Sequence, residues 1–181
     1  MTAEQMSRTV KRLAHEIIEK NPDARELAIV GIHTRGAFLG QRLHGLLCEL
    51  GGCTYASGNL DITFYRDDVG ERSATGVLPI APAPVVKGSE LPFSVEDATI
   101  VLVDDVLYTG RTVRAAIDAL FRFGRPAAVQ LAVLVDRGHR VLPTRPDYVG
   151  KNVPTAQSER ISVRLSESDG IDEVVLVRSS D

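Results

Sequence analysis

The sequence contains no tryptophan and only two cysteines, Cys48 and Cys53, among its 181 residues. Two cysteines are too few for a disulfide framework, and they match no metal-binding spacing, so we expect two reduced thiols, with Cys48 on a helix. No apolar run approaches the ~20 residues that a membrane helix needs, and the first residues lack the apolar stretch of a signal peptide. We therefore expect a cytoplasmic protein with no membrane partner.

Two glycine-rich phosphate-binding motifs are also absent, since neither G-x-x-x-x-G-K-[ST] nor G-x-G-x-x-G occurs. No repeat, low-complexity segment or internal boundary divides the chain. With 44% hydrophobic and 25% charged residues, the composition is typical of a globular protein. We expect one domain over residues 1–181.

Excess charge of one sign is missing as well. A formal net charge of −3 argues against a protein that binds nucleic acid non-specifically. The charge is unevenly distributed, however, because four of the five charged residues in 137–151 are basic, whereas the tail from Ser166 is mostly acidic. The sequence therefore leaves room for a local basic patch on an acidic protein.

Hydrophobic periodicity indicates an α/β fold in which a central, mostly parallel sheet is flanked by helices. Helices are expected over residues 3–20, from about 35 to 50 and from about 111 to 123. Strands are expected over 27–32, 60–65, 100–103, 127–135, 148–149, 160–165 and 173–178. The intervening stretch 66–92 shows no regular pattern, and an irregular segment of that length is usually a functional lid or disordered.

The stretch 99–112 carries the most distinctive chemistry. A buried apolar run is expected to end at two adjacent acids, Asp104 and Asp105, and a loop containing Thr109 and Gly110 then leads into a helix. Backbone N–H groups at such a loop attract a phosphate, and carboxylates accept hydrogen bonds from sugar hydroxyls. From spacing alone, binding of a phosphorylated sugar and an ordinary solvated loop with a helix cap remain about equally plausible.

A second loop of the same kind follows the strand 27–32. Arg35 can bind an anionic oxygen with two N–H groups, and Gly36 allows close backbone approach. The plainer interpretation is a helix start with an exposed arginine, which a second such loop in one small chain makes less attractive. Asp136 and Arg137 end another strand, so they should face the same crevice beyond the carboxyl ends of the sheet.

The stretch 99–112 resembles the phosphoribosyl-diphosphate (PRPP) motif of type I phosphoribosyltransferases. Residues 34–36 resemble the pyrophosphate loop of that family, and 66–92 its flexible loop. From about residue 9 to 165 the chain is similar to one branch in particular, the pyrimidine-operon regulators that are also uracil phosphoribosyltransferases. The resemblance implies a type I phosphoribosyltransferase fold with a flexible loop and a small hood.

The resemblance also implies a reaction, in which uracil and PRPP give UMP and pyrophosphate with Mg²⁺ carried by PRPP. No preformed metal site is expected, only contact of Mg²⁺ with Asp104 and Asp105 through water. The catalytic residues would be Asp104, Asp105 and Arg35, with Lys87 also able to reach pyrophosphate. The residues expected to bind PRPP or UMP are Thr34, Arg35, Gly36, Arg66, Asp104, Asp105, Val106, Leu107, Tyr108, Thr109, Gly110, Arg111, Thr112, Arg137 and Ile161.

The resemblance further implies binding of a stem-loop in pyrimidine operon leader mRNA, strengthened by UMP or UTP, and assembly as a homodimer or larger homo-oligomer. The RNA-binding residues would be His15, Arg140, Arg145 and Lys151. Two departures bear on RNA affinity. Lys11 stands where some relatives have a hydroxyl residue, and Ala156-Gln157 where a basic residue is often found.

Two alternatives remain open at this point. One is a type I phosphoribosyltransferase for another nucleobase, such as a purine, without RNA binding. The other is a regulator that binds nucleotide but scarcely turns over, against which the intact acid pair and the loop 34–36 count.

Overall fold

The computed structural model describes residues 1–22, 26–63 and 88–178. In chain order the elements are α1 (Ala3–Lys20), β1 (Leu27–Ile32), α2 (Arg35–Gly51), β2 (Ala56–Leu60), β3 (Thr99–Leu107), α3 (Arg111–Leu120), β4 (Ala128–Asp136), β5 (Tyr148–Asn152), β6 (Glu159–Arg164), α4 (Ser166–Asp169) and β7 (Glu173–Arg178). No helix in these ranges combines the length and the apolar character needed to cross a bilayer. Most of the expected lid, including Arg66 and Lys87, lies outside the described residues.

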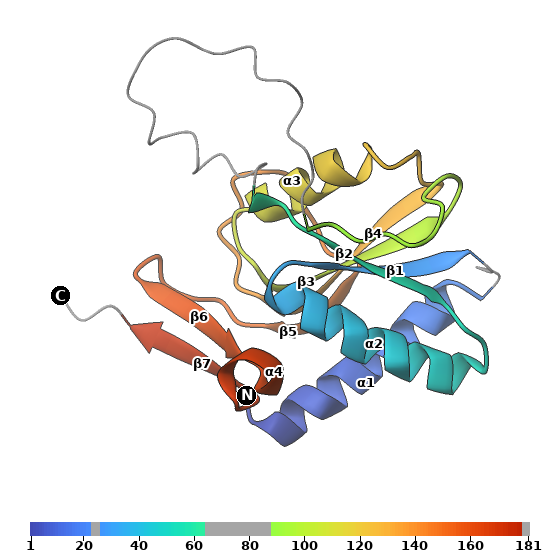
Figure 1. Ribbon diagram of the computed structural model, residues 1–181. Coiled ribbons are helices and arrows are strands. Elements are labelled where there is room, and N and C mark those ends of the chain that lie inside the picture. Colours follow the sequence, from blue (N-terminus) through green and yellow to red (C-terminus); the bar gives the residue numbers. More distant parts are fainter. Residues whose placement is uncertain (23–25, 64–87, 179–181) are drawn as a thin grey trace, which may run out of the picture.

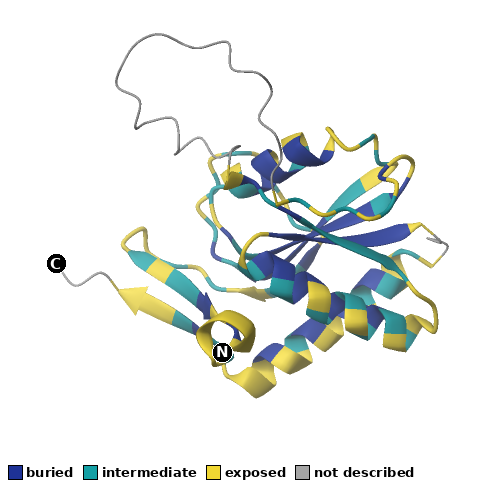
Figure 2. Cartoon of the chain, viewed as in Figure 1, coloured by how far each residue is buried: buried dark blue, intermediate teal, exposed yellow. Residues whose placement is uncertain are grey.

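Five parallel strands form the central sheet in the order β2-β1-β3-β4-β5. All six residues of β1 are buried, as expected for a strand covered on both faces, and the interior strands are dark blue in Figure 2. The chain passes from β1 outward to β2 and then returns to the other side of β1 as β3. The sheet therefore has a topological switch point between β1 and β3, where ligands bind in open α/β sheets.

Helices cover the two faces of this sheet, with α1 and α2 on one side and α3 on the other (Figure 1). Side chains alternate along β3, so Val101 and Val103 join the core beneath α1 and α2, while Ile100 and Leu102 join the core beneath α3. The helix expected over 3–20 is confirmed, and its start is fixed by a capping box between Thr2 and Gln5. The strand periodicity thus separates two apolar clusters across one sheet.

A two-stranded antiparallel sheet, β6-β7, stands apart from the central sheet, with α4 connecting its strands (Figure 1). We call residues 159–178 the hood. Its last strand also pairs with the start of the chain, since the amino group of Met1 donates to the carbonyl of Val174 at 2.7 Å and the N–H of Val174 to the carbonyl of Met1 at 2.9 Å. The edge strand expected over 173–178 is therefore confirmed, but it lies in the hood.

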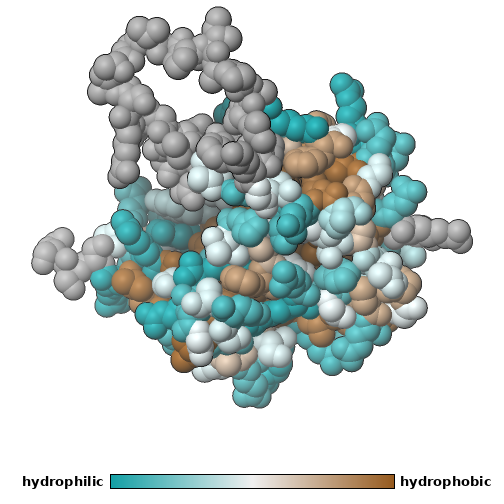
Figure 3. Space-filling model, viewed as in Figure 1, coloured by the Kyte–Doolittle hydropathy of each residue, from teal (hydrophilic) through white to brown (hydrophobic). Residues whose placement is uncertain are grey.

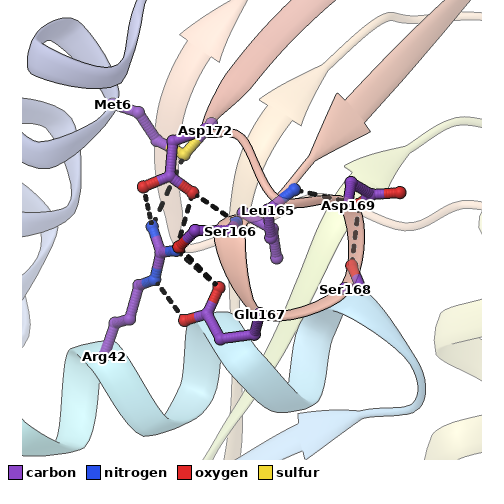
Figure 4. Close-up of polar contacts among 8 residues, drawn as sticks. All are labelled: Met6, Arg42, Leu165, Ser166, Glu167, Ser168, Asp169 and Asp172. Carbon is purple, nitrogen blue, oxygen red and sulfur yellow. Dashed lines mark hydrogen bonds and ion pairs between the residues drawn. The ribbon is translucent and has the colours of Figure 1, made fainter.

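Arg42 of α2 holds the hood in place (Figure 4). Its guanidinium donates to both carboxylate oxygens of Glu167 at 2.8 and 2.6 Å and to those of Asp172 at 3.1 and 2.7 Å. The same group reaches the hydroxyl of Ser166 at 3.0 Å. Because these bonds to Arg42 stabilise the ionised carboxylates, the pKa values of Glu167 and Asp172 lie below their usual range.

The strand expected over 60–65 is wrong for the residues that are described there, which end at residue 63. The observed strand β2 covers Ala56–Leu60 and pairs with β1, and the chain turns at its end. The turn is made by Asp61, whose carboxylate accepts the N–H and the hydroxyl of Thr63 at 2.9 and 2.6 Å, a local bond that competes with strand pairing. Residues 56–59 contain no large apolar residue, so periodicity could not reveal this strand.

The expectation that the acid pair ends its strand is also wrong. Strand β3 continues through Asp104 and Asp105 to Leu107, because its pairing with β4 continues as far as the Leu107–Asp136 pair. Asp104 is only 6% exposed. The acids are thus part of the sheet rather than the beginning of a solvated loop.

We expect Arg42→Ala to lower the free energy of unfolding by about 1–3 kcal/mol, because it leaves two neighbouring carboxylates without their common partner. Urea unfolding measures this change. The matched control is Arg114→Ala, since Arg114 and Asp118 are 66% and 59% exposed and 3.7 Å apart; that variant should lose less than about 0.5 kcal/mol. Equal losses in both variants would contradict a special role of Arg42.

The same cluster predicts acid sensitivity. The pKa values of Glu167 and Asp172 are lowered from their ordinary 4.5 and 3.8, so their contribution to stability is present above those values and is lost as pH falls through the lower values of the folded state. The stability difference between wild type and Arg42→Ala should therefore shrink between about pH 6 and about pH 3. A difference that stays constant over this interval, measured by urea unfolding, would speak against the ion cluster.

Candidate functional site

The two predicted anion loops meet at the switch point of the sheet. Gly31 of β1 is paired with Val103 of β3, so the loops that follow these strands leave the same edge. A Cβ atom added to Gly36 would lie 2.4 Å from the carbonyl oxygen of Val103 and 3.2 Å from the Cα atom of Asp104. The absence of a side chain at Gly36 therefore lets the first turn of α2 pack directly on the backbone of the acid pair.

The acid pair lies beside this contact. The buried carboxylate of Asp104 accepts the N–H of Asp105 at 2.9 Å, and Asp105 itself is half-buried. The pair is followed by two exposed or half-exposed residues, Tyr108 and Thr109, at the entry to α3. Carboxylate oxygens thus lie next to a helix start, a combination that suits a ligand with both hydroxyls and a phosphate.

The loop before α3 has a backbone shape that only glycine adopts readily. Gly110 caps the helix with a φ of 89°, and a Cβ atom there would approach the hydroxyl of Thr144 to 2.7 Å. Thr109 accepts the N–H groups of Val141 and Leu142 at 3.1 and 3.0 Å through its carbonyl oxygen. The segment after β4 therefore supports the loop from behind, while the first turn of α3 presents N–H groups without intrahelical acceptors.

Arg140 completes this support. Its guanidinium donates to the carbonyl oxygens of Tyr108, Gly138 and Thr144 at 2.9, 3.1 and 3.1 Å and forms an ion pair with Asp136. Only 22% of the Arg140 side chain is exposed. The structure thus uses Arg140 to join the end of β4 to the loop 108–112.

Arg137, which we expected to face the crevice, directly follows β4 and is buried, with only 6% exposed. It donates from Nε to the hydroxyl of Thr155 at 3.0 Å and from its terminal nitrogen to the carbonyl of Glu159 at 2.7 Å. Its guanidinium also lies 4.0 Å from the ring centre of Tyr108, a cation–π contact. These contacts link the loop 108–112 to the start of the hood. Ile161, which lies in this part of the hood, is half-buried.

His139 is exposed. The structure nevertheless gives it two specific contacts: its Nε2 lies 2.6 Å from the carbonyl of Thr155, and its ring meets that of Tyr108 edge-on at 6.1 Å. No spacing in the sequence indicates these contacts, because the partners are 16 and 31 residues away.

In the loop that resembles a pyrophosphate loop, residues 34–36, Thr34 is exposed and Arg35 is half-buried. The terminal nitrogen of Arg35 donates to Asp169 of α4 at 3.0 Å. The peptide bond between His33 and Thr34 is cis. The structure therefore brings Thr34, Arg35 and Gly36 to the acid pair and also connects them to the hood.

The four predicted RNA-binding residues do not share one environment. His15, Arg145 and Lys151 are exposed, whereas Arg140 is engaged in the crevice. Helix α1 does reach β5, because Arg12 donates to the carbonyl oxygens of Val149 and Gly150 at 3.1 and 2.7 Å. Helix α1 and strand β5 thus form adjoining surfaces. Figure 3 shows one face of the molecule, where hydrophilic residues surround smaller apolar areas.

In the parts of the chain that the structure describes, no three His, Cys, Asp or Glu side chains are grouped so that they could hold a metal ion. Cys48 and Cys53 are free thiols, and Cys48 lies on α2 as expected.

Residues 2–168 match the family model described as the phosphoribosyl transferase domain. The chain is 54% identical to "Bifunctional protein PyrR" of Deinococcus deserti, over 97% of this chain and 92% of that protein, and 52% identical to the protein of the same name from Deinococcus radiodurans, over 100% and 94%. Among solved structures, hypoxanthine phosphoribosyltransferase of Trypanosoma cruzi has a similar fold, with a TM-score of 0.72, 18% identity and coverage of 99% and 95% of the two chains.

Proposed function

Since this chain belongs to the phosphoribosyltransferase family, and within it to the bifunctional PyrR proteins, we propose how its described residues divide the two activities. The protein is a uracil phosphoribosyltransferase and a pyrimidine-responsive regulator of transcription that acts on mRNA. One observation carries the assignment of the site: the contact of Gly36 with Val103 and Asp104, which joins two anion loops at the switch point. The substrates are PRPP and uracil, and the products are UMP and pyrophosphate.

Each part of PRPP has a matching group in the crevice. Asp104 and Asp105 accept hydrogen bonds from the 2′- and 3′-hydroxyls of ribose. The 5′-phosphate is bound by backbone N–H groups of residues 106–112 and by the hydroxyls of Thr109 and Thr112. Thr34, Arg35 and Gly36 bind the pyrophosphate, which leaves with the electron pair of the broken carbon–oxygen bond.

Positioning and charge stabilisation account for the chemistry. The anomeric carbon passes through an oxocarbenium-like state as N1 of uracil forms the new bond and loses its proton, so a strong base is not required. Mg²⁺ fits the carboxylate oxygens of Asp104 and Asp105 through water, and when bound it neutralises part of the charge of the pyrophosphate. The assignment also includes Arg66 and Lys87 of the expected lid, which lie outside the described part of the chain.

The base binds on the side of the crevice formed by Arg137 and Ile161. Arg137 is held rigidly by Thr155 and Glu159, so its position is set before uracil arrives. Backbone groups near Ile161 present fixed donors and acceptors to the imide edge of a pyrimidine. The contact of Arg137 with Tyr108 connects this base side to the loop that holds the 5′-phosphate.

The regulatory activity uses a surface formed by α1 and the segment after β4. His15, Arg145 and Lys151 offer exposed positive or titratable groups to the phosphates of a leader stem-loop. Arg140 contributes through the conformation of residues 137–145, since its own guanidinium is bonded in the crevice. Lys11 and Gln157 differ from the residues that relatives often have at these positions, and they change the RNA affinity.

Leader mRNA and PRPP are cytoplasmic molecules, which supports a cytoplasmic protein. UMP and UTP would occupy the same crevice as PRPP and report the pyrimidine supply. A homodimer or larger homo-oligomer is part of the proposal, because two copies would enlarge the RNA-binding surface.

We expect Asp105→Asn to reduce uracil phosphoribosyl transfer at least tenfold, a loss of about 1.4 kcal/mol of transition-state stabilisation, because the amide no longer accepts hydrogen bonds with both of its end groups. Product formation with uracil and with hypoxanthine measures the activity and its base preference. Asp118→Asn on the exposed face of α3 is the control and should keep full activity. Unchanged turnover of Asp105→Asn would remove the acid pair from the mechanism.

RNA binding should depend on salt, with a log–log slope of about −2 to about −3 if His15, Arg145 and Lys151 each contact one phosphate. Gel shifts with leader RNA, with and without UMP, measure the affinity. Lys151→Ala should reduce the slope by about 1 and leave uracil transfer unchanged, because Lys151 is exposed on β5, away from the acid pair. A salt-independent affinity, or an affinity unaffected by UMP, would contradict the regulatory assignment.

A further inference from the structure

Two arginines of α2 point toward the hood. Arg35 and Arg42 are seven residues apart, which is almost two helical turns, so both lie on the same side of α2. Each meets a carboxylate from the short segment 165–172 between β6 and β7. The hood is therefore held to α2 at two points, of which only the one at Arg35 lies beside the acid pair.

The two points differ in strength. Arg42 shares several hydrogen bonds with Glu167 and Asp172, an arrangement that fixes both partners. Arg35 makes a single bond of 3.0 Å from one terminal nitrogen to Asp169. The contact at Arg42 therefore fixes its partners more firmly than the single bond at Arg35 does.

The carboxylate of Asp169 has a fixed orientation and a negative charge, both of which favour contact with a cation. Its second carboxylate oxygen accepts the N–H of Leu165 at 3.0 Å and the hydroxyl of Ser168 at 2.7 Å. The bond from Leu165, the hydroxyl of Ser168 and the nearby Arg35 lower its pKa to about 2, so it is ionised at any physiological pH. A carboxylate with a fixed orientation and a permanent charge restricts the guanidinium opposite it.

Arg35 is left with spare donors. Its Nε atom is buried and has no hydrogen-bond partner among the described residues, although buried donors are nearly always satisfied. The side chain as a whole remains 39% exposed. Asp169 therefore occupies one edge of the guanidinium, whereas the structure describes no acceptor for the remaining N–H groups.

We propose that Asp169 is a positioning residue of the pyrophosphate site, which holds Arg35 by one nitrogen so that its other N–H groups face the pyrophosphate of PRPP. This inference rests on the proposed role of Arg35. An unrestrained arginine loses much rotamer freedom when it binds a ligand, and Asp169 removes that freedom beforehand. The negative charge of Asp169 also repels pyrophosphate, so the sign of a mutational effect distinguishes positioning from competition.

The arrangement couples the hood to the substrate. If pyrophosphate binds better to an Arg35 that is held by Asp169, then bound pyrophosphate must strengthen the Arg35–Asp169 contact by the same factor. Backbone N–H groups of residues 165–172 should therefore exchange hydrogen more slowly when pyrophosphate is added.

Asp169→Asn tests the proposal, because asparagine keeps an oxygen for Leu165 and removes the charge. We expect the KM for PRPP and the Kd for pyrophosphate to rise about threefold to tenfold, with kcat within about twofold and the KM for uracil unchanged. Titration calorimetry gives the pyrophosphate affinity, and thermal unfolding shows whether the variant is folded. An unchanged or stronger pyrophosphate affinity would overturn the proposal.

Glu167→Gln is the matched control. It alters the same short helix and loosens the hood at Arg42, but it leaves the Arg35–Asp169 contact in place. This variant should keep the wild-type KM for PRPP. If it raises that KM as much as Asp169→Asn does, the effect comes from hood docking in general and the positioning role is refuted.

Arg35→Gln separates this inference from the proposed function. If Arg35→Gln leaves pyrophosphate affinity unchanged, the assignment of Arg35 to pyrophosphate fails, and the role of Asp169 fails with it. If Arg35→Gln weakens binding and Asp169→Asn does not, only the role of Asp169 fails. Where both weaken binding, Asp169→Asn should add little in the Arg35→Gln background, because the two residues act through one contact.

Discussion

The backbone of Gly36 packs directly on strand β3, and the candidate site depends on this contact. A Cβ atom at Gly36 would overlap the carbonyl of Val103, and one at Gly31 would lie 2.5 Å from the Cα atom of Ala37. Two glycines thus bring β1, the start of α2 and the acid pair together without intervening side chains. This close approach places the loop 33–36 beside the acid pair.

The segment after β4 connects the parts of the site. It begins at Arg137, which contacts Tyr108 and the start of the hood, and continues through Arg140, which supports the loop 108–112. It ends in β5, whose carbonyl groups accept hydrogen bonds from Arg12 of α1. One continuous segment therefore connects the loop 108–112 and the hood to the surface of α1.

Much of the fold could be predicted from sequence because its signals are local. The apolar spacing of α1 and the capping box at Thr2 depend on residues within a few positions of each other, and both are confirmed. Strand β2 could not be found in the same way, because its residues carry little apolar pattern and pair with β1 through the backbone alone. The end of β3 was misplaced for a related reason, since pairing with β4 continues through two acids that look like a strand end.

By itself, the sequence determined the acid pair, the two loops that we predict to bind anions, and the family to which the chain belongs, because each is a short pattern whose chemistry depends on neighbouring residue types. Tertiary structure alone decided what those residues face. It placed Arg140 behind the phosphate loop, set Arg137 against Tyr108 and brought Asp169 to Arg35, 134 residues away. Such contacts depend on how helices and strands pack across the sheet. The stretch 99–112 therefore forms one side of a candidate site to which β1, the segment after β4 and the hood also contribute residues.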